Sequence, residues 1–293
     1  MKLIRQDFNI VNQKGFSIKD IKKHIEYCAR ISYKSQDRIT DDSYEKFVNM
    51  LEKRDHARPL EFGTVHLKMP WNTFINFAGF CVSKGFWDSC WIKYYIDRDS
   101  ENKMVYITTN YRYYKRLKSL KSLYGYINVE EFFTEEDNEY YPKRYTVHFI
   151  TSRGIMDEFR THVGLSHLAE SSRYCSYDKN RFGNELTFII PNWINTNCPN
   201  KEQEGLSVAS IEWFTAMLNA EASYMNLIKM DCTAQEAREV LPLAVKSELI
   251  SCGFEDVWSN FFYRRCAKDA HPMAREIATK VRDKFKELNY VNQ

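Results

Sequence analysis

Residues 151–191, TSRGIMDEFRTHVGLSHLAESSRYCSYDKNRFGNELTFIIP, say more about the fold and function of this chain than any other stretch. They place a histidine, two serines, an arginine and a tyrosine at spacings that core packing alone would not produce: His162, Ser166, Ser171, Arg173 and Tyr174. Ser171 and Arg173 can offer a hydroxyl and a guanidinium to one phosphate or to the edge of a pyrimidine. The stretch is therefore a candidate binding site for a phosphate or a pyrimidine. Positive charge is missing at two positions where the spacing leads us to expect it, Thr161 and Val163.

The bulk composition is that of a globular protein. Of the 293 residues 44% are apolar, enough to fill one large core, and we expect a single domain over residues 1–293. The net charge is +3 with both signs interspersed, which argues against a nucleic-acid-binding protein. Any phosphate recognition must therefore be local.

The sequence carries no signal for a membrane, for export or for a metal. No apolar run approaches the ~20 residues of a membrane span, and the opening MKLIRQDFNI lacks the centre of a signal peptide, so we expect a cytoplasmic protein without a membrane partner. The eight cysteines form no CxxC pair, which predicts buried reduced thiols and no metal site. They are Cys28, Cys81, Cys90, Cys175, Cys198, Cys232, Cys252 and Cys266.

Apolar periodicity predicts both helices and strands in the first two thirds of the chain. Helices are expected after Ser17, which can act as the capping residue, and after Asp42. Alternating or apolar runs predict strands at 64–69, 145–151 and 185–190, and a helix should follow the second of these strands through about residue 162.

The last third reads as helical. One long amphipathic pattern contains Ile211, Phe214, Leu218 and Met225. Thr233 can cap the helix that contains Arg238, and Pro272 can start a final helix with three inward side chains, Met273, Ile277 and Val281.

Long helices beside a few strands predict an α+β fold, in which helices pack around a small mixed or antiparallel sheet. Residues 71–144 are the least regular part of the chain, with many aromatic residues and charged patches. We expect them to form an enlarged insertion with short helices of its own.

Two further arginines, Arg238 and Arg265, lie in helical segments that are otherwise rich in apolar residues. An arginine on a buried side needs an anionic partner, which can be a carboxylate or the phosphate of a ligand. Each candidate has an ordinary structural explanation: a surface charge, a turn serine, a core histidine or a helix ion pair. Only the joint spacing favours a binding site.

That spacing resembles the signature of the flavin-dependent thymidylate synthase (ThyX) family: Arg-His-Arg, seven residues, Ser, and Arg-Tyr shortly after. The frame here is THV at 161–163, seven residues, Ser171, and RY at 173–174. Two later segments, AREVLP (237–242) and FFYRRCAKDAHPMARE (261–276), resemble the arginine-bearing segments of the family. The early segments YCARISYKSQDRITDDS and HARPLEF resemble its N-terminal elements.

The resemblance implies a homotetramer that binds FAD and deoxyuridine monophosphate (dUMP) at subunit interfaces. NADPH reduces the flavin, and methylenetetrahydrofolate supplies the carbon that is delivered to uracil C5, so no residue acts as a nucleophile. By matching position, the residues expected to bind dUMP are Glu158, Ser171, Arg173, Arg238 and Arg265. His162 and Asn260 match positions that contact the flavin.

The departures from the family pattern fall mostly on the flavin side. Thr161 and Val163 replace both signature arginines, and Arg160 or His66 are possible substitutes for them. The loss of two charge-assisted hydrogen bonds, at ~1.5–3 kcal/mol each, weakens the binding of a diphosphate.

Three hypotheses follow. The first is an FAD-dependent thymidylate synthase that converts dUMP to dTMP. The second keeps the fold and the pyrimidine nucleotide but has altered one-carbon chemistry at C5. The third is a non-catalytic nucleotide-binding or scaffolding homologue that has lost its flavin.

Overall fold

The computed structural model describes residues 1–99, 103–124, 128–171, 185–194 and 207–291. Its central feature is a four-stranded antiparallel sheet in the order β2-β7-β10-β8. The four strands are β2 (Asp7–Ile10), β7 (Arg144–Ser152), β8 (Ser166–Ala169) and β10 (Lys246–Phe254). Helices and strands together form the α+β arrangement that the sequence predicts.

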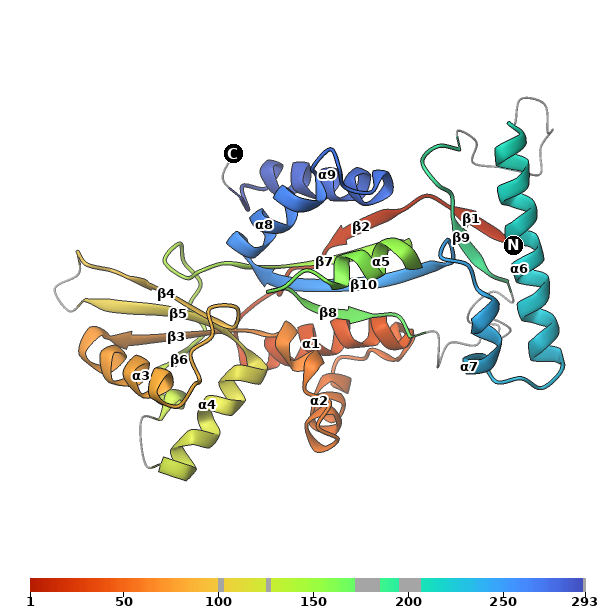
Figure 1. The fold of residues 1–293 in the computed structure, drawn as a ribbon. Coiled ribbons are helices and arrows are strands. Elements are labelled where there is room, and N and C mark those ends of the chain that lie inside the picture. Colours follow the sequence, from red (N-terminus) through yellow and green to blue (C-terminus); the bar gives the residue numbers. More distant parts are fainter. Residues whose placement is uncertain (100–102, 125–127, 172–184, 195–206, 292–293) are drawn as a thin grey trace.

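Helices cover both faces of the central sheet (Figure 1). On one face Phe149 of β7 and Leu249 of β10 join a core with helices α5 (Arg153–Arg160), α8 (Glu255–Arg265) and α9 (Pro272–Glu287). On the other face Cys28 and Ile31 pack on Ile250 of β10. These two residues belong to helix α1 (Ile18–Tyr33), which is followed by α2 (Ser43–Lys53). Burial on both faces fixes the sheet between two helical layers.

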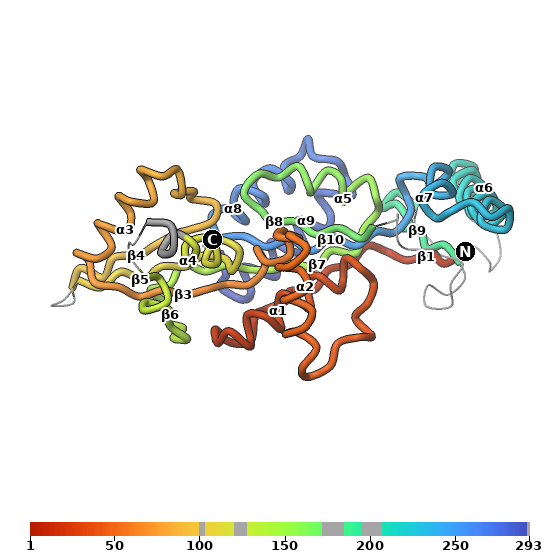
Figure 2. The backbone as a smooth tube through the Cα atoms, turned by 90° about the horizontal axis from the view of Figure 1, so that it is seen from below, coloured from red at the N-terminus to blue at the C-terminus, as the bar shows by residue number. Residues whose placement is uncertain are grey.

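A second sheet, in the order β4-β5-β3-β6, lies at one end of the elongated molecule (Figure 2). Its strands are β3 (Thr64–Pro70), β4 (Ile92–Ile96), β5 (Met104–Asn110) and β6 (Phe133–Thr134), and its helices are α3 (Trp71–Ser83) and α4 (Tyr111–Tyr124). The helices expected in this region are present, but strands β4 and β5 were not predicted. All seven residues of β5 pair with β3, and Val105 and Ile107 join Val65 and Leu67 in one core.

At the other end, α6 (Val208–Lys229) and α7 (Ala234–Ala237) pack on a parallel pair of strands, β1 (Lys2–Ile4) and β9 (Thr187–Ile189). The helix itself was predicted, but its inward face was predicted only in part. Phe214 is buried, whereas Ile211 and Leu218 are exposed. Met217 and Tyr224 are buried instead, because α6 covers a narrow two-stranded surface.

The prediction of an entirely helical last third was wrong at β10, which pairs along its whole length with β7. The strand was missed because polar side chains occur on its buried positions. Ser247, Glu248 and Ser251 are each less than a tenth exposed. Apolar and polar residues therefore do not alternate along it.

Several local predictions are confirmed. The Ser17 hydroxyl caps α1 by accepting from the Asp20 backbone N–H, and Thr233 forms a capping box with Glu236. Pro272 begins α9, whose buried residues include Met273, Ile277 and Val281. The prediction of buried reduced thiols is confirmed only in part: of the six described cysteines, all free, Cys28, Cys81 and Cys252 are buried and the other three are partly exposed.

No helix within the described residues is long and apolar enough to cross a membrane. No group of three or more acidic, histidine or cysteine side chains in that part of the chain is arranged to hold a metal ion.

Candidate nucleotide site

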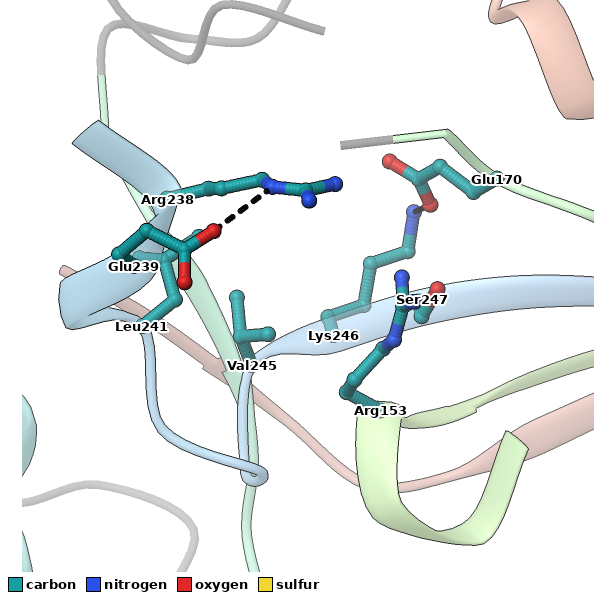
Figure 3. Close-up of a pocket in the computed structure, with 8 residues that line it drawn as sticks. All are labelled: Arg153, Glu170, Arg238, Glu239, Leu241, Val245, Lys246 and Ser247. Carbon is teal, nitrogen blue, oxygen red and sulfur yellow. Dashed lines mark hydrogen bonds and ion pairs between the residues drawn. The ribbon is translucent and has the colours of Figure 1, made fainter. Parts of the chain in front are cut away.

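A pocket of about 180 Å³ lies where α5 and β10 begin and α7 ends (Figure 3). Three cationic and two acidic side chains line it together with small and apolar residues. We call it the cationic pocket, and its lining residues are Arg153, Glu170, Arg238, Glu239, Leu241, Val245, Lys246 and Ser247. Arg238 and Arg153 face it from opposite sides (Figure 3).

Backbone pairing builds this pocket. Ser152 ends β7 opposite Lys246, the first residue of β10, and its hydroxyl accepts from the Ile155 backbone N–H to start α5. The Arg153 backbone N–H donates to the Val245 carbonyl at 2.9 Å, and the Gly154 N–H donates to the Leu243 carbonyl at 3.1 Å. The first turn of α5 is thereby attached to the segment that leads into β10, which places Arg153 beside Lys246.

Arg238 follows directly after α7, whose capping box fixes the turn before it. Its Nε lies 3.3 Å from the Glu239 Oε1, and both side chains are substantially exposed. The pair is therefore weak. Figure 3 shows the Arg238 side chain extending across the pocket toward Glu170. An anion that enters the pocket can also contact this guanidinium.

Ser171 directly follows Glu170, which lines the pocket, but it does not itself belong to the lining. The Glu170 backbone N–H donates to the Glu248 carbonyl at 2.8 Å, and the Ser171 N–H donates to the Ser32 carbonyl at 3.4 Å. The segment is thus held between β10 and the end of α1. Arg173, the other candidate of this segment, lies outside the described residues.

Behind the pocket lies a cluster of four charged side chains, Lys34, Glu170, Lys246 and Glu248, which we call the lysine–glutamate cluster. The Lys246 Nζ lies 3.1 Å from the Glu170 Oε2, and the Lys34 Nζ lies 3.6 Å from the same oxygen. Both ammonium groups also contact the Glu248 Oε1. The other oxygen of Glu248 lies 2.9 Å from the His148 Nε2. Two cations and two anions balance each other at this site.

Burial and neighbouring charges change the pKa values of the cluster in different directions. Although burial opposes ionisation, the His148 hydrogen bond and the Lys246 charge hold the pKa of the Glu248 carboxyl well below its usual range. Burial also acts against Lys246, yet Glu170 and Glu248 raise its pKa above the ordinary value. Burial lowers the pKa of Lys34. Lys246 is therefore the more firmly charged of the two lysines.

Two other predicted residues meet at the opposite end of α5. The Arg265 Nη2, at the end of α8, donates to the Glu158 carbonyl at 2.6 Å and to the Thr161 Oγ1 at 3.0 Å. Its Nη1 lies 3.5 Å from the Glu158 Oε2. The arginine thus caps the carboxyl end of α5, a favourable place for a cation. Thr161, which occupies the position of one of the two missing signature arginines, is a partner of this guanidinium.

The predicted flavin residues lie around this end of α5 without forming a charged cradle. His162 is buried edge-on against Phe261, and this burial lowers its pKa. Its Nε2 has no hydrogen-bond partner within the described chain.

The other candidates at this end of α5 already have partners or are exposed. The Asn260 Oδ1 accepts from the Arg264 Nε at 3.2 Å. Arg160 pairs with Asp157 at 3.4 Å, and Val163 is 84% exposed.

His66 lies elsewhere, on β3 of the second sheet. Its ring is stacked between Phe16 and Tyr141, with ring centroids 3.9 Å apart on each side. Its Nδ1 lies 2.8 Å from the Glu136 carbonyl oxygen, and burial lowers its pKa to about 4. Within one chain, its environment is that of a core histidine.

Within one chain, the predicted nucleotide residues therefore lie in two groups, one at each end of α5. Arg238 lines the pocket at the start of α5 and Ser171 follows the lining residue Glu170, while Glu158, Arg265 and His162 lie at the other end of this helix, whose eight residues span about 12 Å at ~1.5 Å each. Sequence reasoning did not single out Arg153, Lys246 or Lys34. The available signal was weak: Lys246 and Glu248 have the i, i+2 spacing that puts them on one face of a strand.

Comparisons with known proteins bear on this site. A family model described as "Thymidylate synthase complementing protein" matches residues 143–289. Among solved structures, the chain is similar to a UMP/dUMP methylase, PolB, from Streptomyces cacaoi bound with 5-Br dUMP. The TM-score is 0.43 at 14% identity, with 98% of this chain and 93% of that chain covered. No curated protein sequence matches.

Proposed function

The chain belongs to the thymidylate synthase complementing protein family, and we propose that it methylates C5 of deoxyuridine monophosphate. Methylenetetrahydrofolate would supply the carbon, FAD would carry the redox chemistry, and NADPH would reduce the flavin. The enzyme would act as a homotetramer.

The cationic pocket is the observation that supports this proposal. Its about 180 Å³ can take a phosphate group, but it is smaller than the roughly 300–1,000 Å³ typical of pockets that enclose a whole organic ligand. The nucleotide would place its phosphate among Arg153, Arg238 and Lys246, with its sugar and base outside. The Ser171 hydroxyl and the Arg173 guanidinium would complete the phosphate site.

The proposed roles of Glu158 and Arg265 require an assembled oligomer. Because these residues and Arg238 lie at opposite ends of α5, we propose that one nucleotide contacts them from different copies of the chain. A rigid phosphate anchor would hold the pyrimidine ring in a fixed orientation, which lowers the entropic part of the barrier to methyl transfer.

The described residues fit a flavin only in part. The buried His162 Nε2 has no partner and could donate to or accept from a ligand. The cations for a diphosphate are absent at Thr161 and Val163, and His66 is enclosed by two rings. The fit is therefore incomplete on the diphosphate side, and we derive no step through the flavin.

This incomplete fit favours a second candidate, a protein that binds a pyrimidine monophosphate but carries out different one-carbon chemistry at C5. The observation behind it is that Arg265 already uses Thr161 as a hydrogen-bond partner. An arginine at 161 would bring a like charge to this position.

The absorption spectrum of the purified protein, with and without added FAD, separates these candidates. A flavin spectrum together with binding of dUMP supports the first candidate. Binding of dUMP or deoxycytidine monophosphate by a protein that cannot be loaded with FAD supports the second. Failure of both nucleotides to bind in calorimetric titrations contradicts both, and leaves the non-catalytic homologue.

A further inference from the structure

Lys34 does not line the cationic pocket, and its backbone conformation is unusual for a lysine. It is the C-cap of α1, with φ 50° and ψ 51° in the left-handed region. Glycine and asparagine are the usual residues there, because a Cβ is unfavourable in this conformation. Position 34 nevertheless carries a long cationic side chain, which reaches into the lysine–glutamate cluster.

The cluster connects Lys34 to the cationic pocket through two carboxylates. Glu170 lines the pocket and is only 3% exposed, so its negative charge would repel an incoming phosphate. Lys246 lines the pocket as well, but it alone cannot balance both Glu170 and Glu248. Lys34 supplies the second positive charge from behind, and it does not belong to the pocket lining.

We propose that Lys34 is a positioning residue for phosphate binding: by sharing Glu170 and Glu248 with Lys246 from the α1 side, it leaves the positive charge of Lys246 only partly neutralised and able to attract the phosphate of the nucleotide. The inference builds on the proposed function, because it concerns the same pocket. Lys246 touches the phosphate directly, whereas Lys34 acts only through the charge balance of the cluster.

The first test compares dUMP with deoxyuridine, which lacks the phosphate. In Lys34→Gly the backbone conformation is retained by a residue that favours it, but the ammonium is removed. We expect the Kd for dUMP to rise about tenfold, since one unit charge a few ångströms away at a partly buried site is worth at least that factor. The Kd for deoxyuridine should not change. Equal weakening of both ligands would overturn the proposal.

Charge restoration provides the second test. Lys34→Gly combined with Glu170→Gln returns the cluster to neutrality and should recover most of the lost dUMP affinity. Lys34→Arg should also keep it. If neither variant differs from Lys34→Gly, charge balance is not the cause and the proposal is wrong.

A matched control removes a lysine from the same helix. Lys23 pairs with the exposed Asp41 at 3.9 Å and lies outside the cluster. Lys23→Gly would also change the helix interior, so Lys23→Met is the better control, and it should leave the Kd for dUMP unchanged. A rise equal to that of Lys34→Gly would mean that only the overall charge of the protein matters, which contradicts the proposal.

Lys34→Met replaces Lys34→Gly if the glycine variant does not fold. It also removes the ammonium, so the Kd for dUMP should rise relative to the Kd for deoxyuridine. An unchanged ratio of these two Kd values would overturn the proposal.

Titration with inorganic phosphate separates this inference from the proposed function. Phosphate binding that weakens in Lys34→Gly, in a protein that does not bind dUMP, would leave the inference standing and remove the proposed function. A wild-type protein that binds neither phosphate nor dUMP would contradict both.

Discussion

Arg265 and Glu158 join the ends of two helices: the Arg265 Nη2 donates to the Glu158 carbonyl at 2.6 Å while its Nη1 faces the Glu158 carboxylate at 3.5 Å. The same guanidinium hydrogen-bonds to Thr161. Both residues are candidates for nucleotide binding, yet in the free chain they also have a structural role, because the arginine caps α5. Mutations here must therefore be examined for stability as well as for binding.

Replacing Arg265 with glutamine should destabilise the protein. The change removes a cation from the carboxyl end of α5 and leaves two acceptors without their donor, which we expect to lower the free energy of unfolding by about 1–2 kcal/mol. Chemical denaturation measures this value. Arg264→Gln is the control, since Arg264 bonds only to the exposed Asn260 among the contacts described. Equal effects of the two substitutions would show that the cap is unimportant.

Arg238→Gln should weaken nucleotide binding. A phosphate in the cationic pocket would lose a charged donor, so we expect the Kd for dUMP to rise about tenfold or more. Glu239→Gln keeps the arginine and should bind dUMP at least as tightly as wild type. A weaker affinity in that control would contradict the assignment of the pocket.

Buried histidines should make the fold sensitive to mild acid. Burial lowers the pKa of His24, His66 and His167 to about 4 in each case. The unfolded chain takes up these protons near pH 6.5 and the native state only near pH 4, so stability is complete above the unfolded pKa and falls as pH decreases between these values. For His66 the loss from about pH 7.5 to 5 is roughly 2 kcal/mol.

His66→Phe tests this dependence. Phenylalanine can keep the stack between Phe16 and Tyr141 but cannot be protonated. The variant should be less stable than wild type at neutral pH, because the hydrogen bond to the Glu136 carbonyl is lost. Its further loss of stability on acidification should be smaller than that of wild type. Parallel pH profiles of the two proteins would refute the assignment of a low pKa to His66.

Gly63 permits the close approach of α1 to the chain before β3. A Cβ at this position would lie 2.7 Å from the Ile21 Cγ2 and 2.8 Å from the Ile25 Cδ1, both on a buried helix face. Gly63→Ala should therefore destabilise the protein by about 1–3 kcal/mol in thermal or chemical unfolding. Gly79→Ala in α3 meets no atom within 4 Å and should stabilise it by about 0.5–1 kcal/mol. A neutral Gly63→Ala would mean that α1 can move away from this position.

Sequence reasoning succeeded where the signal is local. The Ser17 and Thr233 caps and strand β7 depend on neighbouring residues, which one stretch of sequence contains. It failed at β10 and β5, where Glu248 and the run after Ile107 place polar residues on buried strand positions. The Glu248 carboxylate has a partner far along the chain, His148, and the Thr109 hydroxyl donates to the Trp91 carbonyl.

The cationic pocket was predictable only in part for the same reason. Arg238 and Ser171 were named because their spacing resembles that of a known family. Arg153 and Lys246 come together through the pairing of Ser152 with Lys246 between β7 and β10. That register is a tertiary property, and no local pattern indicates it. The binding roles of all the predicted residues stay predictions: Glu158, Ser171, Arg173, Arg238 and Arg265 for the nucleotide, and His162 and Asn260, with Arg160 or His66 as substitutes, for the flavin.

Release of tritium from dUMP labelled at C5 tests the central claim most directly. Wild-type protein supplied with FAD, NADPH and methylenetetrahydrofolate should release tritium and form dTMP, and Arg238→Gln should do so at a rate at least about tenfold lower at limiting dUMP. A protein that binds both dUMP and FAD under these conditions, yet releases no tritium and forms no dTMP, would contradict the proposed activity.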